Sequence, residues 1–218
     1  MIVNYTVLDP AKNITIIVHT SINKKDRRMV ADKLMQKEPS AEQVGFLEGN
    51  VLDMAGGEFC GNAVRCAATV SGESKIICAG QEINCDDTAA YIPKDLAGIN
   101  HYIFTSTMPK EDAERQIKEK ACGSATGFMF LDQENMKLVP LVYVPEADTL
   151  YWENSCASGS VAVGKYLCET LKTEIDVKLQ QPGGALRVKT SPEDQFVMID
   201  GKIDIVNRGE LCIPELNY

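Results

Sequence analysis

Short apolar runs, separated by residues that favour turns, recur along the chain and predict many short strands. In the first half we expect strands at residues 1–8, 14–19, 41–48, 75–78, 82–85 and 89–92. In the second half we expect them at residues 101–105, 127–131, 138–144, 177–179, 186–189, 196–199 and 203–206. A turn at residues 9–13 separates the first two strands, so they are expected to pair as a hairpin.

Four segments have the apolar spacing or the starting residues of helices. Asp26 is expected to cap a helix that continues to about Gln36, and residues 109–120 predict a charged surface helix. Two further helices are expected to follow Cys60 and Cys156. The last is apolar on nearly every side, which predicts burial. Many short strands around a buried helix indicate a curled sheet or barrel wrapped on a central helix.

The stretch around Cys60 predicts a loop, a cysteine at a helix start and a helix that ends near Gly72. A cysteine at this place faces free N–H groups and the positive end of the helix dipole, and both favour the thiolate. The adjacent Gly61 lets a carboxylate approach the same N–H groups. The alternative is a buried free cysteine at an ordinary helix start.

The stretch around Cys156 repeats this pattern. In both places a glutamate precedes the cysteine, and small residues and a helix follow it. The two cysteines are too far apart in sequence to share one element. Two partial copies of one motif therefore predict two similar lobes that face each other.

Composition excludes several classes of function. The chain has 218 residues, enough for one large domain or two lobes, and its apolar content of 44% is ordinary for a globular protein. Its net charge of −9, without a basic patch, argues against nucleic acid as a partner. It begins with no signal-peptide pattern and has no apolar run of membrane-spanning length. We expect a cytoplasmic protein that binds no membrane.

Eight cysteines and only two histidines limit the possible metal and disulfide chemistry. No two cysteines have the spacing of a metal-binding pair, so a structural zinc site is poorly supported. Without a signal peptide, free thiols are expected rather than a disulfide framework. The cysteines are Cys60, Cys66, Cys78, Cys85, Cys122, Cys156, Cys168 and Cys212.

Several motifs resemble the diaminopimelate-epimerase-like family of cofactor-independent amino-acid racemases and epimerases. The stretches around Cys60 and Cys156 resemble its two cysteine motifs, and residues 181–186 resemble its Pro-Gly-Gly turn. The histidine racemases of opine-type metallophore pathways are the most similar subgroup, on the segments 13–19, 42–46, 58–63, 140–145 and 152–156.

The resemblance implies an α+β fold of two pseudo-symmetric lobes. Each lobe is a strand-rich half-barrel wrapped on a central helix, and the active site lies in the cleft between them. The composition at residues 93–98 favours a lobe boundary there, which gives lobes at 1–95 and 96–207. The resemblance also implies that a last strand, within 208–218, returns to the first lobe. Family members are often dimers, so a homodimer is possible.

Racemisation removes the α-proton of an amino acid from one face and returns a proton to the other. This needs one deprotonated base and one protonated acid on opposite faces. Cysteine suits both roles, since its pKa can be set near neutrality. We expect Cys60 and Cys156 to form this pair, with a small-molecule amino acid as substrate and with no cofactor or metal.

The carbanion is the difficult intermediate, because its charge spreads into the α-carboxylate. Backbone N–H groups at two helix starts would stabilise that charge. The alternative for these small residues is tight helix packing. The expected donors are Gly61, Asn62, Ala157, Ser158 and Gly159.

Five further residues lie where the resemblance places contacts to the substrate. Asn13, Glu42 and Gln43 belong to the first half, although Asn13 could be a turn former and Glu42 a solvated carboxylate. Glu153 and Asn154 take the place of a Glu-Arg pair in diaminopimelate epimerases. Asparagine cannot grip a distal carboxylate as arginine does. Histidine is therefore the hypothesised substrate, with Glu42 or Glu153 as a partner for the imidazole N–H.

Other functions stay open on sequence alone. The chain could be a diaminopimelate epimerase or a racemase of another amino acid. Two cysteines at helix starts could instead form a reversible disulfide in a thiol redox protein. A third possibility is an amino-acid-binding protein without catalysis.

Overall fold

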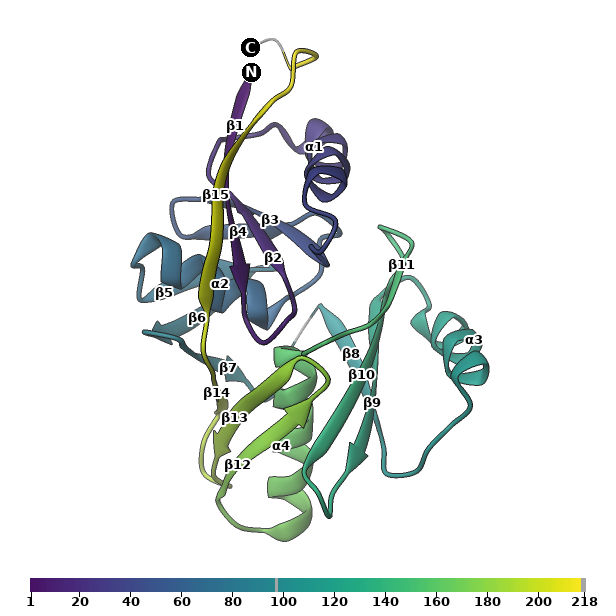
Figure 1. Ribbon diagram of the computed structural model, residues 1–218. Helices are drawn as coiled ribbons and strands as arrows, with labels where there is room; N and C mark the ends of the chain where they lie inside the picture. The colour runs from purple at the N-terminus through teal and green to yellow at the C-terminus, as the bar shows by residue number, and fades with distance from the viewer. Residues whose placement is uncertain (97, 217–218) are drawn as a thin grey trace.

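One continuous mixed sheet of 15 strands and four helices form the described part of the chain, an α+β architecture (Figure 1). The computed structural model describes residues 1–96 and 98–216. The helices are α1 (Lys24–Lys37), α2 (Gly61–Ser71), α3 (Lys110–Ala121) and α4 (Ala157–Leu171). The strands are β1 (Ile2–Asp9), β2 (Thr15–Val18), β3 (Gln43–Glu48), β4 (Val51–Met54), β5 (Lys75–Cys78), β6 (Gln81–Asp86), β7 (Ala89–Pro93), β8 (Ile99–Phe104), β9 (Ala125–Asp132), β10 (Lys137–Val144), β11 (Thr149–Trp152), β12 (Ile175–Gln181), β13 (Gly184–Thr190), β14 (Phe196–Asp200) and β15 (Asp204–Cys212).

The order of the strands links the two halves of the chain. The path runs β15-β1-β2-β3-β4-β5-β6-β7-β14-β13-β12-β10-β9-β8, and β11 pairs with β10 beside it. β7 and β14 pair antiparallel and join the strands near α2 to those near α4. β15 lies antiparallel along β1, so the end of the chain lies beside its start (Figure 1). The predicted hairpin of β1 and β2 is confirmed.

Two strands were not predicted, and several predicted strands were too short, among them the last one. β4 and β11 are four residues each, and each pairs antiparallel with a neighbouring strand, β3 and β10. The pattern predicted a strand only at 203–206, whereas β15 runs from Asp204 to Cys212 without a break. Nearly all its side chains are exposed, so no alternation of apolar residues marks its length.

Helix α1 begins two residues before the predicted cap. Asn23 occupies the cap position without a side-chain hydrogen bond, and Asp26 lies in the first turn. The prediction that Asp26 caps the helix is therefore wrong, although its carboxylate is placed well for the helix dipole. Val30 and Leu34 are buried, as their spacing predicted.

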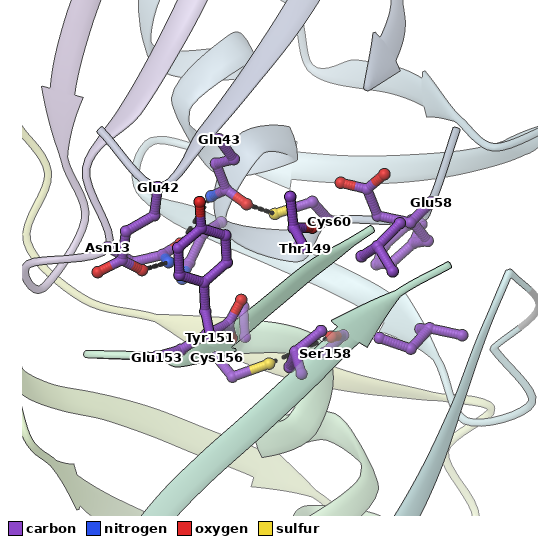
Figure 2. A pocket seen from close by; sticks show the side chains of 17 residues that line it. Asn13, Glu42, Gln43, Glu58, Cys60, Thr149, Tyr151, Glu153, Cys156 and Ser158 are labelled. Atoms are coloured by element: carbon purple, nitrogen blue, oxygen red, sulfur yellow. Dashed lines mark hydrogen bonds between the residues drawn. The ribbon is translucent and has the colours of Figure 1, made fainter. Parts of the chain in front are cut away.

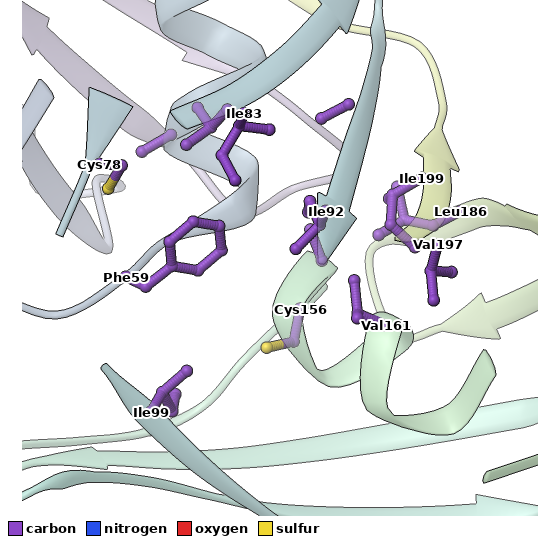
Figure 3. Close-up of a cluster of buried hydrophobic side chains, with 14 of the residues drawn as sticks. Phe59, Cys78, Ile83, Ile92, Ile99, Cys156, Val161, Leu186, Val197 and Ile199 are labelled. Carbon is purple, nitrogen blue, oxygen red and sulfur yellow. The ribbon is translucent and has the colours of Figure 1, made fainter. Parts of the chain in front are cut away.

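Helices α2 and α4 lie against many strands each. α2 contacts β2, β5, β6 and β7, whereas α4 contacts β8, β9, β12, β13 and β14. One apolar cluster includes residues of both helices. Figure 3 shows part of it: Ile92 lies near Val161 and Val197, and Phe59 lies on the side of Cys78 and Ile83. The predicted burial of α4 is confirmed.

The division into two half-barrel lobes remains a prediction. Residue 97, inside the expected boundary at 93–98, lies outside the described residues, as do the last two residues of the expected strand segment 208–218. No helix in the described ranges combines the length and apolar character needed to cross a membrane.

The N-terminal ends of α2 and α4 touch each other. A Cβ atom on Gly61 would lie 2.9 Å from the Cβ of Ala157 and 3.4 Å from the backbone nitrogen of Ser158. Neither atom can move without its backbone. Glycine at position 61 therefore allows the contact, which brings the two cysteine motifs to one place.

A Gly61→Ala variant is expected to lose about 1–3 kcal/mol of unfolding free energy, because the added methyl group forces the two helix ends apart. Urea denaturation followed by circular dichroism measures this loss. Glu169→Ala, at an exposed position of α4, is the control and should change stability by less than about 0.5 kcal/mol. Equal stability of Gly61→Ala and the wild type would contradict a tight contact.

Candidate active site

Cys60 and Cys156 occupy the cap positions of α2 and α4 with almost the same backbone conformation. Their φ and ψ angles are −129° and 108° for Cys60, and −132° and 108° for Cys156. The Sγ of Cys60 accepts a hydrogen bond from the N–H of Ala63 at 3.4 Å. The Sγ of Cys156 accepts one from the N–H of Gly159 at 3.3 Å. The two predicted copies of the motif therefore have the same local structure.

Both cysteines line one cavity. Figure 2 shows their sulfur atoms on opposite sides of it, Cys60 from the α2 end and Cys156 from the α4 end. Among the described residues, no lysine or arginine lines this cavity. The residues that line it are Asn13, Glu42, Gln43, Glu58, Phe59, Cys60, Gly61, Asn62, Ile99, Val142, Val144, Thr149, Tyr151, Glu153, Cys156, Ala157 and Ser158.

Ten of the twelve residues proposed from the sequence line this cavity. The other two, Asn154 and Gly159, lie behind its wall. Asn154 donates its side-chain N–H to Oε1 of Glu42 at 2.6 Å, and the N–H of Gly159 is directed at the sulfur of Cys156. Their roles as substrate contacts remain predictions, and their observed contacts are to other residues of the site.

Both carboxylate oxygens of Glu42 accept hydrogen bonds from asparagine side chains. The side-chain nitrogen of Asn13 donates to its Oε2, while Asn154 donates to Oε1. Burial raises the pKa of Glu42, and these hydrogen bonds oppose that shift. Both carboxylate oxygens therefore have partners within the protein.

Gln43 connects Asn13 to Cys60. Its Nε2 donates to Oδ1 of Asn13 at 2.6 Å and to the hydroxyl of Thr15 at 2.8 Å. Because that hydroxyl donates its own hydrogen to the carbonyl of Asn13, it must accept from Gln43. The orientation of the amide is thus fixed, and its Oε1 accepts the thiol hydrogen of Cys60 at 3.0 Å. This arrangement favours the protonated form of Cys60.

Asn62 connects the hydrogen bonds around Asn13 to the buried guanidinium group of Arg65. Its Nδ2 donates to Oδ1 of Asn13 at 2.9 Å and to the carbonyl of Ser155 at 3.1 Å. Its Oδ1 accepts from Nη1 of Arg65 at 3.2 Å, and the Arg65 side chain is fully buried. The side-chain amide of Asn62 is therefore occupied, which leaves its backbone N–H as the group available to a ligand.

A different set of contacts holds Cys156. Its backbone N–H donates to Oε1 of Gln181 at 2.8 Å, and its sulfur lies 3.4 Å from the hydroxyl of Ser158. That hydroxyl lies 3.2 Å from Nε2 of His101. Burial lowers the pKa of His101 to about 4, so the imidazole is neutral at neutral pH. Gln181 and His101 were not among the proposed site residues.

Burial raises the pKa of both cysteine thiols well above the usual value. The N–H groups of Ala63 and Gly159 act in the opposite direction, but more weakly. The N–H groups at the helix starts therefore favour the thiolates, as predicted, but the expectation of thiol pKa values near neutrality is wrong, because the cavity walls remove water from both sulfurs. Burial also raises the pKa of Glu153, beside Cys156, to about 8.

Several residues that line the cavity were not proposed from the sequence. Glu58 lies two residues before Cys60, and the sequence analysis used it as part of the motif but gave it no role. Thr149 and Tyr151 belong to β11, which was not predicted as a strand. Val142 and Val144 of β10 also line the cavity, and only their tertiary position reveals them.

Alkylation by iodoacetamide is expected to modify the exposed Cys122 and Cys212 before Cys60 and Cys156. Because their pKa values are raised, Cys60 and Cys156 carry little thiolate at pH 7. Their rates should rise about tenfold per pH unit until the raised pKa is reached. Peptide mass spectrometry measures each site. Equal rates for Cys60 and Cys122 at pH 7 would contradict this electrostatic description.

Known proteins resemble the chain over nearly its whole length. A family model described as the histidine racemase CntK N-terminal domain matches residues 2–87 and 94–212. A histidine racemase from Fusobacterium nucleatum is 31% identical, with 97% of each chain covered. One from Staphylococcus aureus is 25% identical, with 97% of this chain and 98% of that protein covered.

A crystal structure of a probable proline racemase from Agrobacterium radiobacter has the same fold. It superposes with a TM-score of 0.66 at 11% identity, over 99% of this chain and 94% of that one. The family model and the Fusobacterium relative, taken together with the paired cysteine caps, establish that this chain belongs to the histidine racemase family.

Proposed function

We propose that this protein racemises histidine without a cofactor, by proton transfer between Cys60, Cys156 and the α-carbon. The observation that carries the proposal is the pair of helix-capping cysteines on opposite sides of one cavity (Figure 2). Full-length similarity to histidine racemases supports the choice of reaction and substrate.

The reaction consists of two proton transfers on opposite faces of one carbon. The thiolate of one cysteine takes the α-proton as the Cα–H bond breaks, and the electron pair spreads into the α-carboxylate. The thiol of the other cysteine then gives its proton to the opposite face of the α-carbon. The thiol and thiolate have exchanged places, so the enzyme is poised for the reverse direction. Cys60 and Cys156 act as one coupled pair.

The helix starts are suited to the charge that develops on the carboxylate. In each half, one N–H, from Ala63 or Gly159, points at the sulfur. The N–H groups of Gly61, Asn62, Ala157 and Ser158 are the donors that we assign to the substrate carboxylate. Two helix dipoles directed at one carboxylate stabilise it most when it becomes an enediolate, which lowers the barrier.

The acidic end of the cavity fits the α-ammonium group of the substrate. Glu42 and Glu153 line this end together with Asn13. A cation bound beside Glu153 offsets the repulsion between its carboxylate and a nearby thiolate. Substrate binding therefore supplies the positive charge that the buried thiols lack, and it makes one of them a usable base.

The side-chain chemistry argues against diaminopimelate. Asn154 lies where the resemblance places an arginine in diaminopimelate epimerases, and its side chain donates a hydrogen bond to Glu42. No lysine or arginine lines the cavity to hold a second carboxylate. A neutral or cationic side chain such as imidazole suits these walls better.

In D₂O the wild type is expected to racemise L-histidine and to incorporate deuterium at the α-carbon. Cys60→Ser and Cys156→Ser should each lose about 10²-fold or more in rate, because a serine hydroxyl is a far weaker acid and base. Chiral chromatography and NMR measure racemisation and exchange. Cys122→Ser, at an exposed position, is the control and should keep full activity. EDTA and carbonyl-trapping reagents should not inhibit the wild type.

The alternatives give different results in the same assay. Fast turnover of diaminopimelate with none of histidine would reverse the substrate assignment. Histidine binding without deuterium incorporation would indicate a binding protein. Reversible Cys60–Cys156 disulfide exchange with no proton exchange would favour a thiol redox protein.

A homodimer is the association that we propose, from the resemblance to the family. β15 ends the path of strands and pairs only with β1 in the described part of the sheet. Its free edge could pair with a second copy. Sedimentation at micromolar concentration should give twice the monomer mass of 23.9 kDa, whereas a single species at that mass would contradict a dimer.

A further inference from the structure

The two cysteines differ in their access to solvent. Cys60 is partly exposed, whereas Cys156 is buried. This difference matters because every turnover exchanges the thiol and the thiolate. A second turnover in the same direction begins only after one sulfur has lost a proton and the other has gained one. Cys60 can exchange its proton with water in the cavity, but the buried Cys156 needs another route.

A chain of hydrogen-bonding groups leads away from the sulfur of Cys156. The first group is the hydroxyl of Ser158, which lies 3.4 Å from the sulfur (Figure 2). The second is Nε2 of His101, which lies 3.2 Å from that hydroxyl. A hydroxyl donates one hydrogen bond and accepts others at the same time, so Ser158 can pass a proton between its two neighbours.

His101 lies in the wall of a second cavity, which adjoins the first at Ser158. Ser158 lines both cavities, whereas His101 lines the second and not the first. The second cavity is also lined by the exposed residues Asp95, Asn100 and Glu169, so it is accessible to bulk water. The His101 side chain is itself partly exposed. The chain of groups therefore connects the buried sulfur to solvent.

The pairing of β8 with β9 holds the His101 ring in place. His101 lies opposite Gly127 in the parallel register of these strands. A Cβ atom on Gly127 would lie 2.8 Å from Cδ2 of the ring and 3.3 Å from its Nε2. The ring therefore packs directly on the backbone at Gly127, which keeps Nε2 within reach of the Ser158 hydroxyl.

A neutral imidazole is suited to passing protons. Burial lowers the pKa of His101 to about 4, so at neutral pH one ring nitrogen carries a hydrogen and the other accepts one. A proton that enters at Nε2 can leave from Nδ1 in the same step, and the ring then ends neutral in its other tautomer. Exchange with water restores the first tautomer.

We propose that Ser158 and His101 form a proton relay between Cys156 and the water of the second cavity. The relay rests on the proposed function, because it resets the thiol and thiolate between turnovers. In the outward step the S–H proton of Cys156 moves to Oγ of Ser158, the hydroxyl proton moves to Nε2 of His101, and the Nδ1 proton moves to water. Cys156 is left as a thiolate and both relay residues are neutral. The inward step runs the same transfers in reverse.

Glu153 is the rival route, because it also lies beside Cys156. It lines the first cavity, where we assign it to the ammonium group of the substrate. A proton that passes through Glu153 stays in the cavity that the next substrate enters. The relay instead leads out of that cavity, so it remains open to water while an amino acid is bound.

The test compares two reactions of His101→Gln. Glutamine can keep a hydrogen bond to Ser158, but its amide does not pass protons at neutral pH. Net conversion of L- to D-histidine needs a reset after every turnover. Transfer of a carbon radiolabel from L- to D-histidine in an equilibrated racemic mixture needs none, because D-histidine itself converts the enzyme back.

The His101→Gln variant should lower the kcat of net conversion by about tenfold or more, and KM should fall by the same factor. The ratio kcat/KM should stay within about threefold of the wild type, because it does not include the reset of the free enzyme. The rate of label exchange at equilibrium should also stay within about threefold.

Ser158→Ala tests the middle group of the relay. It removes the hydroxyl and keeps the backbone N–H that we assign to the substrate carboxylate. The ratio of label exchange to net conversion should rise by about tenfold or more, as in His101→Gln. Asn100→Ala, at an exposed position of β8 that lines the second cavity, is the control and should change that ratio by less than about twofold.

Each outcome bears on one claim. If the wild type neither racemises histidine nor exchanges its label, the proposed function fails and the relay fails with it. If the wild type is active and both variants keep its kcat, the reset takes another route, such as Glu153, and the relay is overturned. Equal losses of net conversion and label exchange also overturn it, because Cys156 is then displaced rather than slow to exchange its proton. Should His101→Gln not fold, Ser158→Ala decides.

Discussion

The contact between the N-terminal ends of α2 and α4 is the constraint on which the site depends. It is possible because Gly61 has no Cβ to strike Ala157. Each helix start carries about half a positive charge, so two helix starts in contact repel each other, and an anion between them would offset that repulsion. The same contact brings the sulfurs of Cys60 and Cys156 to one cavity.

Burial and helix dipoles compete at the two sulfurs, and burial has the larger effect on the thiol pKa values. One helix-start N–H reaches each thiol, while the cavity walls remove water that would solvate a thiolate. The protonated form of both cysteines is therefore favoured at neutral pH.

The hydrogen bonds of the cavity are distributed unevenly. Asn13, Gln43 and Asn62 form a closed network that ends at the buried Arg65, and its orientation is fixed by Thr15. A rigid network of this kind holds the reacting groups in place without rearrangement. The network therefore fixes the side chains beside Cys60 through contacts that the protein itself supplies.

The sequence by itself determined the local features. The order of glycine, cysteine and small residues placed both helix starts, and the apolar runs placed most of the strands. Both depend on interactions between near neighbours, such as capping and the alternation of side chains. It missed β4 and β11, although β2 and β5 of the same length were predicted, and, unlike β2, neither is buried along its whole length; it also placed the start of α1 too late, at Asp26.

Only the tertiary structure decided the electrostatics and the shape of the site. The direction of the thiol pKa shifts depends on walls built from β3, β8, β10 and β11, which no local pattern brings together. Within residues 1–96 and 98–216, Oε2 of Glu58 has no hydrogen-bond partner, and a missing hydrogen bond can be recognised only when the neighbouring segments are in place. The burial of a side chain depends on several segments that are distant in sequence, whereas the start of a helix depends on a few adjacent residues.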